Sequence, residues 1–457
     1  MKLTKGITSI FIIILTTQSG WATTISDIYE SAVRNDPVMR AARANLNVGK
    51  ENLNVRRAYL LPVISTTASF TQSETDSESS QVYSFIQEDP FESKSFSDSD
   101  TTSYGVSLTQ AIFDMPAWYQ FQSGKAMSDS ARAQFSADQQ SLILRVTDAY
   151  LGALRAFDNS ETRKAEQRAI QRQLEQTTER FEVGLLPITD VHEAQAVFDD
   201  ALVNSLEAQG ASNIAFDALQ VLTGESYDSL SGLTDNFVAK NPDPLDSQDW
   251  VIFSLNNNYQ LKVAKLGKDS SYNQAKAAAA QLYPTITASA RYSDSEREGT
   301  QVSYLPSESS SGTSSLNNGH TFSVSMSMPI WSSGLNAGRR QAKQRSIAAS
   351  ENFNAAKRNT SQTARSRHQL VITSAARVKA RAQAITSAES ALSATQAGYE
   401  VGTRNIVDVL ASQRAVFQSK RNYSNARYDY ILSMMSLKEV AGQLSPDDIY
   451  QLNAWLD

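Results

Sequence analysis

The stretch that decides the fold reads FEVGLLPITDV over residues 181–191, and it returns as YEVGTRNIVDV over residues 399–409. The two copies lie 218 residues apart (402 − 184). In each copy a Glu-Val-Gly sequence is followed, a few residues later, by an Ile-x-Asp-Val sequence. Self-similarity at a fixed spacing indicates that one structural unit is duplicated within the chain.

The repeat extends well beyond these two turns. Phe113 matches Trp331 at the same spacing, whereas Pro62 matches Pro284 at a spacing of 222 residues (284 − 62). The register therefore loses four residues (222 − 218) between the first pair of landmarks and the second. We expect a surface loop in that interval, because loops tolerate changes of length and packed elements do not.

The first 22 residues have the pattern of a secretory signal peptide. Lys2 and Lys5 precede a mostly apolar run from Ile7 to Leu15, and small residues precede an expected cleavage after Ala22. The run is too short for a membrane-spanning helix and no later segment is longer, so we expect no transmembrane helix in the mature chain.

The composition narrows the class of function. The chain contains no cysteine, which excludes disulfides, thiol catalysis, cysteine-ligated metals and a lipid anchor on a cysteine. The formal charge of −6 becomes −8 (−6 − 2) once Lys2 and Lys5 are removed. An acidic chain argues against general nucleic-acid binding, which usually needs a basic face.

Two long stretches have the composition of helices. Prolines are absent from residues 117–186 and 330–445, which are rich in Ala, Gln, Arg, Lys, Glu and Ser. A continuous helix over 117–182 would be about 100 Å long, and helices of that length imply coiled-coil packing. Apolar residues recur at intervals of three and four, which predicts a buried stripe; they are Leu142, Val146, Ala149, Ala153 and Phe157.

Between the helical stretches, apolar and polar residues alternate with the period of β-strands. The alternation follows Pro62 and Pro284 and precedes Phe113 and Trp331 in each repeat. We expect strands of about ten residues, the length that crosses an outer membrane when tilted. Polar loops are expected over about 71–102 and 293–318. A soluble sandwich would give the same alternation for one hairpin taken alone.

The number of expected strands decides between these readings. Four strands cannot close a barrel, and open strand edges are not viable in lipid. The chain must therefore share a barrel with other copies. Two copies would give eight strands and a filled interior, whereas three would give twelve strands and room for water, which fits the Thr and Ser on the polar face.

Together these residues resemble the TolC family of outer-membrane channel-tunnel (outer membrane efflux) proteins, and the resemblance covers essentially the whole mature chain. It implies a mainly α protein with a membrane β-barrel: a homotrimer with a twelve-stranded β-barrel continued by a twelve-helix α-barrel. The first repeat would span residues 23–240, with a strand hairpin at about 63–113. The second would span residues 241–457, with a strand hairpin at about 285–331.

The same resemblance implies the positions of the helices. Residues 115–181 and 334–399 would form the long helices, and residues 223–246 and 442–457 would form equatorial segments around the α-barrel. The shorter helices would cover residues 25–61, 188–222, 247–283 and 405–441.

The two Val-Gly turns would be the periplasmic tips, and the resemblance implies that partner proteins open the channel there. Gly184, Leu185, Gly402 and Thr403 would form adaptor-docking tips. For the periplasmic gate, Tyr399 and Arg404 would bond across to Thr189 and Asp190, with Arg404 to Asp190 as the strongest pair because both groups are charged.

Asp408 has two compatible interpretations. Asn405 precedes it by three residues, the spacing of a capping box, so Asp408 would serve the helix N-terminus. Three copies of Asp408 around a threefold axis would also form a negative ring that attracts cations. Well-known family members carry a second aspartate one turn later, where this chain has Ala411. We therefore expect one acidic ring and a weaker block by multivalent cations.

The sequence contains no pattern of catalysis or cofactor binding. His192, His320 and His368 are isolated and share no metal-ligand spacing. We therefore expect no enzyme activity, no cofactor and no metal site.

The predicted function is an outer-membrane exit duct of a tripartite efflux or type I secretion system, with a periplasmic adaptor and an inner-membrane RND or ABC pump. The alternative is a secreted trimeric coiled-coil structural or adhesive protein with a soluble β head. The sequence leaves the cargo open.

Overall fold

The computed structural model describes residues 22–81, 91–234, 237–305 and 307–456. The expected signal peptide lies outside the described residues, apart from Ala22. The described residues divide into two compact units. The sheet unit comprises Asn45–Gln134 and Gln260–Ala356, and the helical unit comprises residues 22–44, 135–259 and 357–456.

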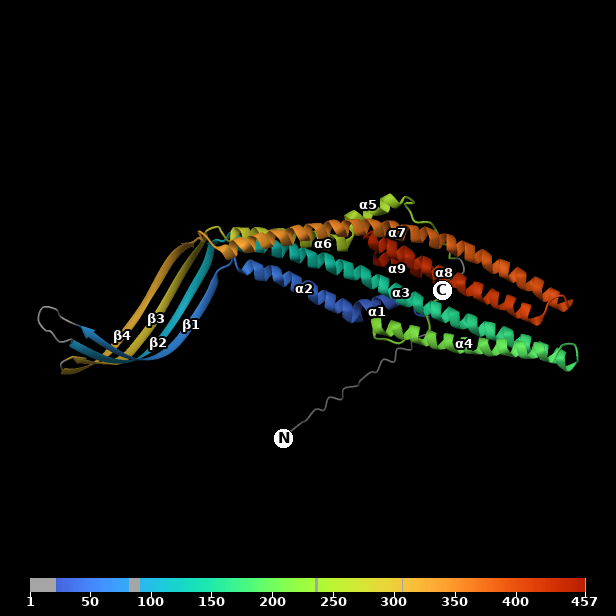
Figure 1. Ribbon diagram of the computed structural model, residues 1–457, viewed down its shortest axis with the longest axis horizontal. Coiled ribbons are helices and arrows are strands. Elements are labelled where there is room, and N and C mark those ends of the chain that lie inside the picture. Colours follow the sequence, from blue (N-terminus) through green and yellow to red (C-terminus); the bar gives the residue numbers. More distant parts are fainter. Residues whose placement is uncertain (1–21, 82–90, 235–236, 306, 457) are drawn as a thin grey trace, which may run out of the picture. The chain divides into compact units, whose positions relative to one another are not determined.

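In the described part of the chain, four antiparallel strands form one sheet in the order β1-β2-β3-β4 (Figure 1). The first repeat supplies the hairpin β1–β2, the second supplies β3–β4, and β2 pairs with β3 across the repeats. β1 and β4 are the edges of the sheet. The strands are β1 (Val63–Gln81), β2 (Phe91–Phe113), β3 (Thr285–Leu305) and β4 (Ser307–Ser327).

The strands are about twice as long as the sequence predicts. They hold 19 to 23 residues, so most of the ranges expected to be loops, 71–102 and 293–318, is paired strand; residues 82–90 and 306 lie outside the described residues. The prediction was wrong because it recognised only the part of each strand that has an apolar face. Beyond that part, the ladder continues to Gln81 opposite Phe91, and the hydroxyls of Ser77 and Ser95 are 2.7 Å apart across the hairpin.

The parts of the strands that adjoin the helices in sequence have one apolar face and one polar face, as the alternation predicts. On the polar face, serine hydroxyls of neighbouring strands are hydrogen bonded, as between Ser65 and Ser107 at 2.8 Å. The apolar side chains are exposed in the single chain: Ile64, Phe70, Met326 and Phe322 are 67% to 73% exposed. Residues that stand directly opposite one another on this face include Ile64, Leu108, Ala290 and Phe322.

Small residues bring the helices of the sheet unit close together. A Cβ atom on Gly49 of α2 (Pro37–Ala58) would overlap the Cβ of Ala131 in α3 (Met115–Glu182). Ser123 of α3 and Ser270 of α6 (Tyr259–Ala280) are hydrogen bonded at 2.9 Å in a buried position. The helical part of the sheet unit is therefore closely packed.

In the helical unit, the long helices lie side by side in the order α4 (Ile188–Thr223), α3, α8 (Ile406–Val440) and α7 (Ser333–Glu400) (Figure 1). Gln209 of α4 accepts a hydrogen bond from Ser160 of α3 (3.3 Å). Arg155 of α3 pairs with Asp429 of α8 (2.6 Å), which also lies 3.8 Å from Arg377 of α7. The further helices of this unit are α1 (Ile25–Asn35), α5 (Ser247–Asn257) and α9 (Pro446–Asn453).

Two helices expected to be continuous, over 25–61 and 247–283, are each interrupted at one residue. Asp36 separates α1 from α2, and Asn258 separates α5 from α6; both have extended backbone. The Asp36 carboxylate accepts from the N–H groups of Val38 and Met39 (3.2 Å each). Pro37 follows Asp36 and disfavours helical conformation at the residue before it, so the sequence did carry a signal for the first break.

The core of the helical unit contains most of the predicted stripe. Leu142, Val146 and Ala153 are buried, whereas Phe157 is 47% exposed, so the prediction was wrong for Phe157. A buried seam needs steps that alternate between three and four residues, because their mean of 3.5 keeps the seam facing its partner. The steps from Ala149 to Ala153 and from Ala153 to Phe157 are both four residues, so Phe157 lies off the seam. The stripe continues instead to buried Ser160. Within the described residues, no helix combines the length and apolar character needed to span a membrane.

Candidate functional site

Both pairs of long helices reverse at a turn of the same geometry. Gly184 and Gly402 each have a φ of +79°, which only glycine adopts without strain. The Gly184 N–H donates to the carbonyl three residues earlier (2.8 Å), and the Leu185 N–H donates to the carbonyl five residues earlier (2.9 Å). Gly402 and Thr403 make the same two bonds at 3.1 and 2.9 Å. These are Schellman motifs, in which the two glycines end their helices.

The second turn is followed by a capped helix. The Asn405 side chain accepts from the backbone N–H of Asp408 (2.9 Å), which confirms that Asn405 is the N-cap of α8. The reciprocal bond of a capping box does not occur among the described residues. The Asp408 carboxylate lies instead 3.6 Å from Nη1 of Arg404. Because the side chains of Arg404 and Asp408 are 62% and 40% exposed, this ion pair contributes little to stability.

Within one chain, the predicted gate residues are only partly brought together. Thr189 and Asp190 lie in the first turn of α4, where the Thr189 hydroxyl is 3.5 Å from the Asp190 carboxylate. Arg404 is paired with Asp408, and no bond between Arg404 and Asp190 occurs among the described residues. The Arg404 to Asp190 pair therefore remains a prediction.

Tyr399 lies in a small apolar cluster formed by α3, α4 and α8 near the turns. Ile170, Ala194 and Ile406 are fully buried in it, and Tyr399 packs against them. The guanidinium of Arg180 stands 5.5 Å from the centre of the Tyr399 ring, a cation–π contact that sequence analysis missed because the two residues are far apart in the chain. The Tyr399 hydroxyl is buried and has no hydrogen-bond partner among the described residues. Leaving a buried hydroxyl unpaired is costly.

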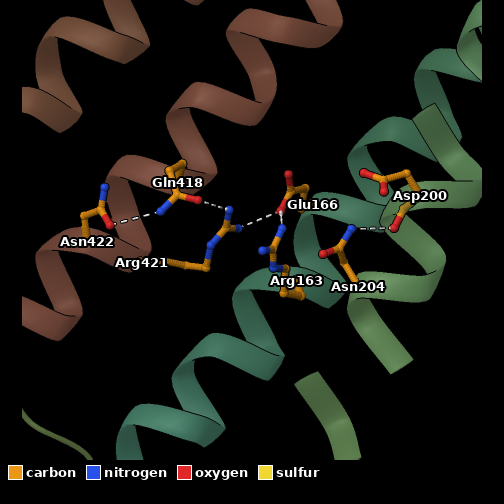
Figure 2. A network of polar contacts seen from close by, with 7 residues as sticks. All are labelled: Arg163, Glu166, Asp200, Asn204, Gln418, Arg421 and Asn422. Carbon is orange, nitrogen blue, oxygen red and sulfur yellow. Dashed lines mark hydrogen bonds and ion pairs between the residues drawn. The ribbon is translucent and has the colours of Figure 1, made fainter. Parts of the chain in front are cut away.

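A network of charged and amide groups, in which Glu166 and Arg421 are buried, joins α3 to α8 (Figure 2). Glu166 of α3 accepts from Arg421 of α8 at 2.6 Å and from Arg163 at 3.2 Å. Gln418 also accepts from Arg421, at 2.8 Å. Burial lowers the pKa of Arg421, and the charge of Glu166 opposes that shift. Sequence analysis missed this network, although a charged residue on the apolar face of α8 was an available signal.

The other predicted positions lie on the surface of single helices or turns. Leu185 is 72% exposed, and Gly184, Gly402 and Thr403 are also exposed, so the proposed adaptor-docking tips are accessible in the single chain. The described residues contain no group of three acidic or histidine side chains arranged to hold a metal ion.

Comparison with known proteins adds the family. The model of the outer membrane efflux protein family matches residues 28–225 and 253–443. The outer membrane protein TolC of Vibrio cholerae is 33% identical over 95% of this chain and 94% of its own length. The alkaline protease secretion protein AprF of Pseudomonas aeruginosa is 26% identical over 96% of this chain and 88% of its own length. The outer membrane protein VceC of Vibrio cholerae has a similar fold, with a TM-score of 0.73 at 18% identity over 92% of this chain and 96% of that structure.

Proposed function

This chain belongs to the outer membrane efflux protein family and is an exit duct of the outer membrane that extends into the periplasm, and we propose that three copies close its channel. The observation that carries this proposal is the four-stranded sheet with two free edges, β1 and β4. Twelve strands joined edge to edge would leave no strand unpaired in the membrane.

The two faces of the sheet support this arrangement. The outward apolar side chains, such as Ile64 and Phe322, would contact lipid, and the hydrogen-bonded serines would line the interior. A large exposed apolar surface marks contact with a membrane or another protein. The match to the outer membrane efflux protein family disfavours the alternative of a secreted protein with a soluble β head.

The helices would continue the channel as a barrel of twelve helices. Residues 223–246 and 442–457 would surround it as an equatorial girdle. A hydrogen bond from the Thr234 N–H to the Trp455 carbonyl (2.9 Å) already joins these two segments within one chain.

The two helix turns would close the periplasmic end of the channel. Tyr399 would bond across to Asp190, which would give its buried, unpaired hydroxyl an acceptor. Arg404 would leave its weak, exposed pair with Asp408 to bind Asp190 and Thr189 of that copy. Three copies of Asp408 would then form one acidic ring at the constriction, without a second ring at Ala411.

The proposed partners follow from the same arrangement. A periplasmic adaptor would dock at the exposed turns around Gly184, Leu185, Gly402 and Thr403 and open the gate. An inner-membrane RND or ABC pump would supply the energy. The relatives include a protease secretion protein and an outer membrane efflux protein, and we propose that the cargo of this chain is a small toxic compound, a polypeptide or both. The role is transport and not catalysis.

Two experiments test the proposal. The mature protein should be recovered from outer-membrane fractions as a trimer that dissociates on heating, and recovery as a monomer, or in the soluble periplasm, would contradict it. In planar bilayers, Asp408→Asn should reduce cation selectivity and block by multivalent cations, with Asp447→Asn in α9 as the control. If Asp408→Asn leaves the selectivity unchanged, the proposed acidic ring is wrong, but the proposed trimer is not contradicted.

A further inference from the structure

The register of the four strands assigns each of their residues to one of two faces. Residues that stand directly opposite one another on paired strands share a face, and so does every second residue along one strand. The serine face contains the row Ser65, Ser107, Arg291 and Thr321. The apolar face contains the adjacent row Ile64, Leu108, Ala290 and Phe322. Counting in steps of two from these rows gives the face of every charged residue.

The acidic residues of the strands all lie on the apolar face, within residues 63–80, 94–113, 285–304 and 309–327. Glu74 of β1, for example, stands opposite Asp98 of β2. Lys94 shares this face and pairs with Glu78 across the hairpin at 2.8 Å. The acidic residues are Glu74, Asp76, Glu78, Asp98, Asp100, Asp294, Glu296 and Glu298. Over the same residues, the serine face therefore has no carboxylate.

Two arginines of β3 supply the charge of the serine face in these ranges. Arg291 stands opposite Ser107 of β2 and Thr321 of β4. Arg297 stands opposite Thr101 of β2. The two arginines are six residues apart (297 − 291), which is about 20 Å along the strand.

Both guanidinium groups lie against the sheet on its serine side. Nη2 of Arg297 donates to the hydroxyl of Ser99 at 3.0 Å. Nη2 of Arg291 lies 3.7 Å from the position that a Cβ atom would have on Gly105. Both arginines are exposed in the single chain. Neither of these contacts is to a carboxylate, so the two positive charges are not compensated on their own face within the described residues.

Arg291 lies in the part of the sheet whose other face is apolar. Its neighbour Ala290 stands opposite Leu108 and Phe322. An arginine that faced lipid at this depth would be strongly destabilising, whereas an arginine in the interior of a barrel is hydrated. The position of Arg291 therefore agrees with a serine face that lines the interior.

We propose that Arg291 and Arg297 form two rings of cations inside the β-barrel, so that the outer-membrane part of the duct attracts anions. The inference rests on the trimeric barrel of the proposed function and adds a chemical class of cargo: molecules with carboxylate, sulfonate or phosphate groups. Rings of arginine or lysine select anions in pores. The low-dielectric wall of the barrel strengthens their field by focusing it into the water of the interior.

The separation of charge between the two faces preserves this field. Side chains on the apolar face point away from the interior, and fields in water are screened over about 8 Å at physiological salt. The carboxylates of that face therefore cancel little of the potential inside. The barrel then has the opposite sign to the acidic ring proposed for Asp408 at the other end of the duct, so the two contributions must be measured separately.

Ion selectivity in planar bilayers tests the rings, in an Asp408→Asn background that removes the acidic ring. Under a salt gradient, Arg291→Gln combined with Arg297→Gln should shift the reversal potential towards cation selectivity. Arg291→Lys should keep the original value, because it keeps the charge. The shift should be smaller at about 1 M salt, where the screening length falls to about 3 Å.

Lys94→Gln is the matched control for the face. It removes the same charge from the same sheet, but on the apolar face, and it should leave the reversal potential nearly unchanged. A shift as large as that of Arg291→Gln would show that the face, and with it the ring, is wrongly assigned.

Thiol modification tests the attraction of anions directly, because the chain has no cysteine of its own. Thr321→Cys places a thiol opposite Arg291. In open channels it should react faster with a sulfonated methanethiosulfonate than with a trimethylammonium reagent of similar size. Adding Arg291→Gln should reduce that ratio of rates. Phe322→Cys, the next residue on the apolar face, should react with neither reagent in a way that changes the conductance.

The outcomes separate this inference from the proposed function. A trimeric channel whose reversal potential and thiol reactivity do not respond to Arg291→Gln and Arg297→Gln would overturn the cation rings alone. Equal effects on conductance at Thr321→Cys and Phe322→Cys would overturn the assignment of the serine face to the interior. A wild-type protein that forms neither trimers nor channels would instead contradict the proposed function.

Discussion

Arg421 of α8 and Glu166 of α3 form an ion pair of 2.6 Å in which both side chains are more than nine-tenths buried. Arg163 supplies a second cation to the same carboxylate at 3.2 Å, so one buried acid holds two arginines. The pair joins the two halves of the duplicated chain, because α3 belongs to the first repeat and α8 to the second. Burying a charge without a partner is expensive. Removing Glu166 and removing Arg421 should therefore cost different amounts of stability, because they leave different charges unpaired.

Glu166→Gln should destabilise the protein more than Arg421→Met. The first change leaves two arginines close together without a counter-charge, whereas the second leaves Glu166 paired with Arg163. Breaking a buried pair from one side costs about 3–5 kcal/mol, and we expect Glu166→Gln at the upper end of that range. Urea unfolding of the detergent-solubilised protein, followed by circular dichroism, measures the difference.

Arg155→Met provides a matched control for this comparison. Its pair with Asp429 has the same length, 2.6 Å, but both side chains are more than a third exposed. An exposed pair is worth about 0–1 kcal/mol, so the control should lose far less stability. Equal losses for Arg155→Met and Glu166→Gln would show that burial does not decide the strength of these pairs.

Gly442→Ala should cost more than Gly402→Ala, although both glycines have positive φ, of 70° and 79°. At Gly402, a Cβ atom would meet nothing within 4 Å, so the cost is the left-handed backbone alone, about 1–2 kcal/mol. At Gly442, a Cβ atom would also overlap the backbone carbonyl of Asn257. Thermal unfolding should therefore rank the wild type above Gly402→Ala and Gly402→Ala above Gly442→Ala, and the opposite order of the two variants would contradict the packing at Asn257.

Glu439 should make the protein less stable as the pH rises. Burial raises the pKa of its carboxyl above the ordinary value of 4.5, and the charge of Arg367 opposes this only in part. Between the unfolded and folded pKa values, the folded state therefore binds more protons than the unfolded state. The free energy of unfolding falls with pH in that window and then stays at its lower value.

Glu439→Gln removes this dependence. The variant should match the wild type below about pH 4.5, where the carboxyl is protonated in both states, and become more stable than the wild type as the pH rises through the raised pKa. Glu389→Gln, at an exposed carboxylate that pairs with Lys420, should show no such gain. Unfolding measured at a series of pH values distinguishes the two, and a gain for Glu439→Gln already complete at low pH would exclude the raised pKa as its cause.

The sequence predicted the parts of the fold that repeat a pattern. The two Glu-Val-Gly turns, the long helices and the alternating strands each follow from periodicity or from glycine at a helix end. It failed where mostly polar residues form regular structure: Ser77 and Ser95 continue the strand ladder where polar residues predominate on both strands. It also failed where one residue interrupts a helix, as at Asn258, because no proline follows there.

The candidate site was predicted only as far as local spacing reaches. The capping of Asp408 by Asn405 is a contact over three residues, and it was readable from the sequence. The contact of Arg180 with Tyr399 and the network around Glu166 join residues more than 200 positions apart. Such contacts depend on the relative levels of separate helices, which periodicity within one helix does not define.

Asn405→Ala should loosen the first turn of α8 and with it the position of Asp408. The Asn405 side chain satisfies the Asp408 N–H at 2.9 Å, and loss of such a cap costs about 1 kcal/mol. If three Asp408 carboxylates form a ring, fraying of this turn should lower the cation selectivity measured in planar bilayers, while Asn405→Ser, which keeps a capping oxygen, should retain it. Pro187 caps the equivalent helix of the first repeat without a side-chain bond, so Pro187→Ala provides a control that removes no capping bond. A selectivity that changes as much in Asn405→Ser as in Asn405→Ala would show that the cap does not hold Asp408 in place.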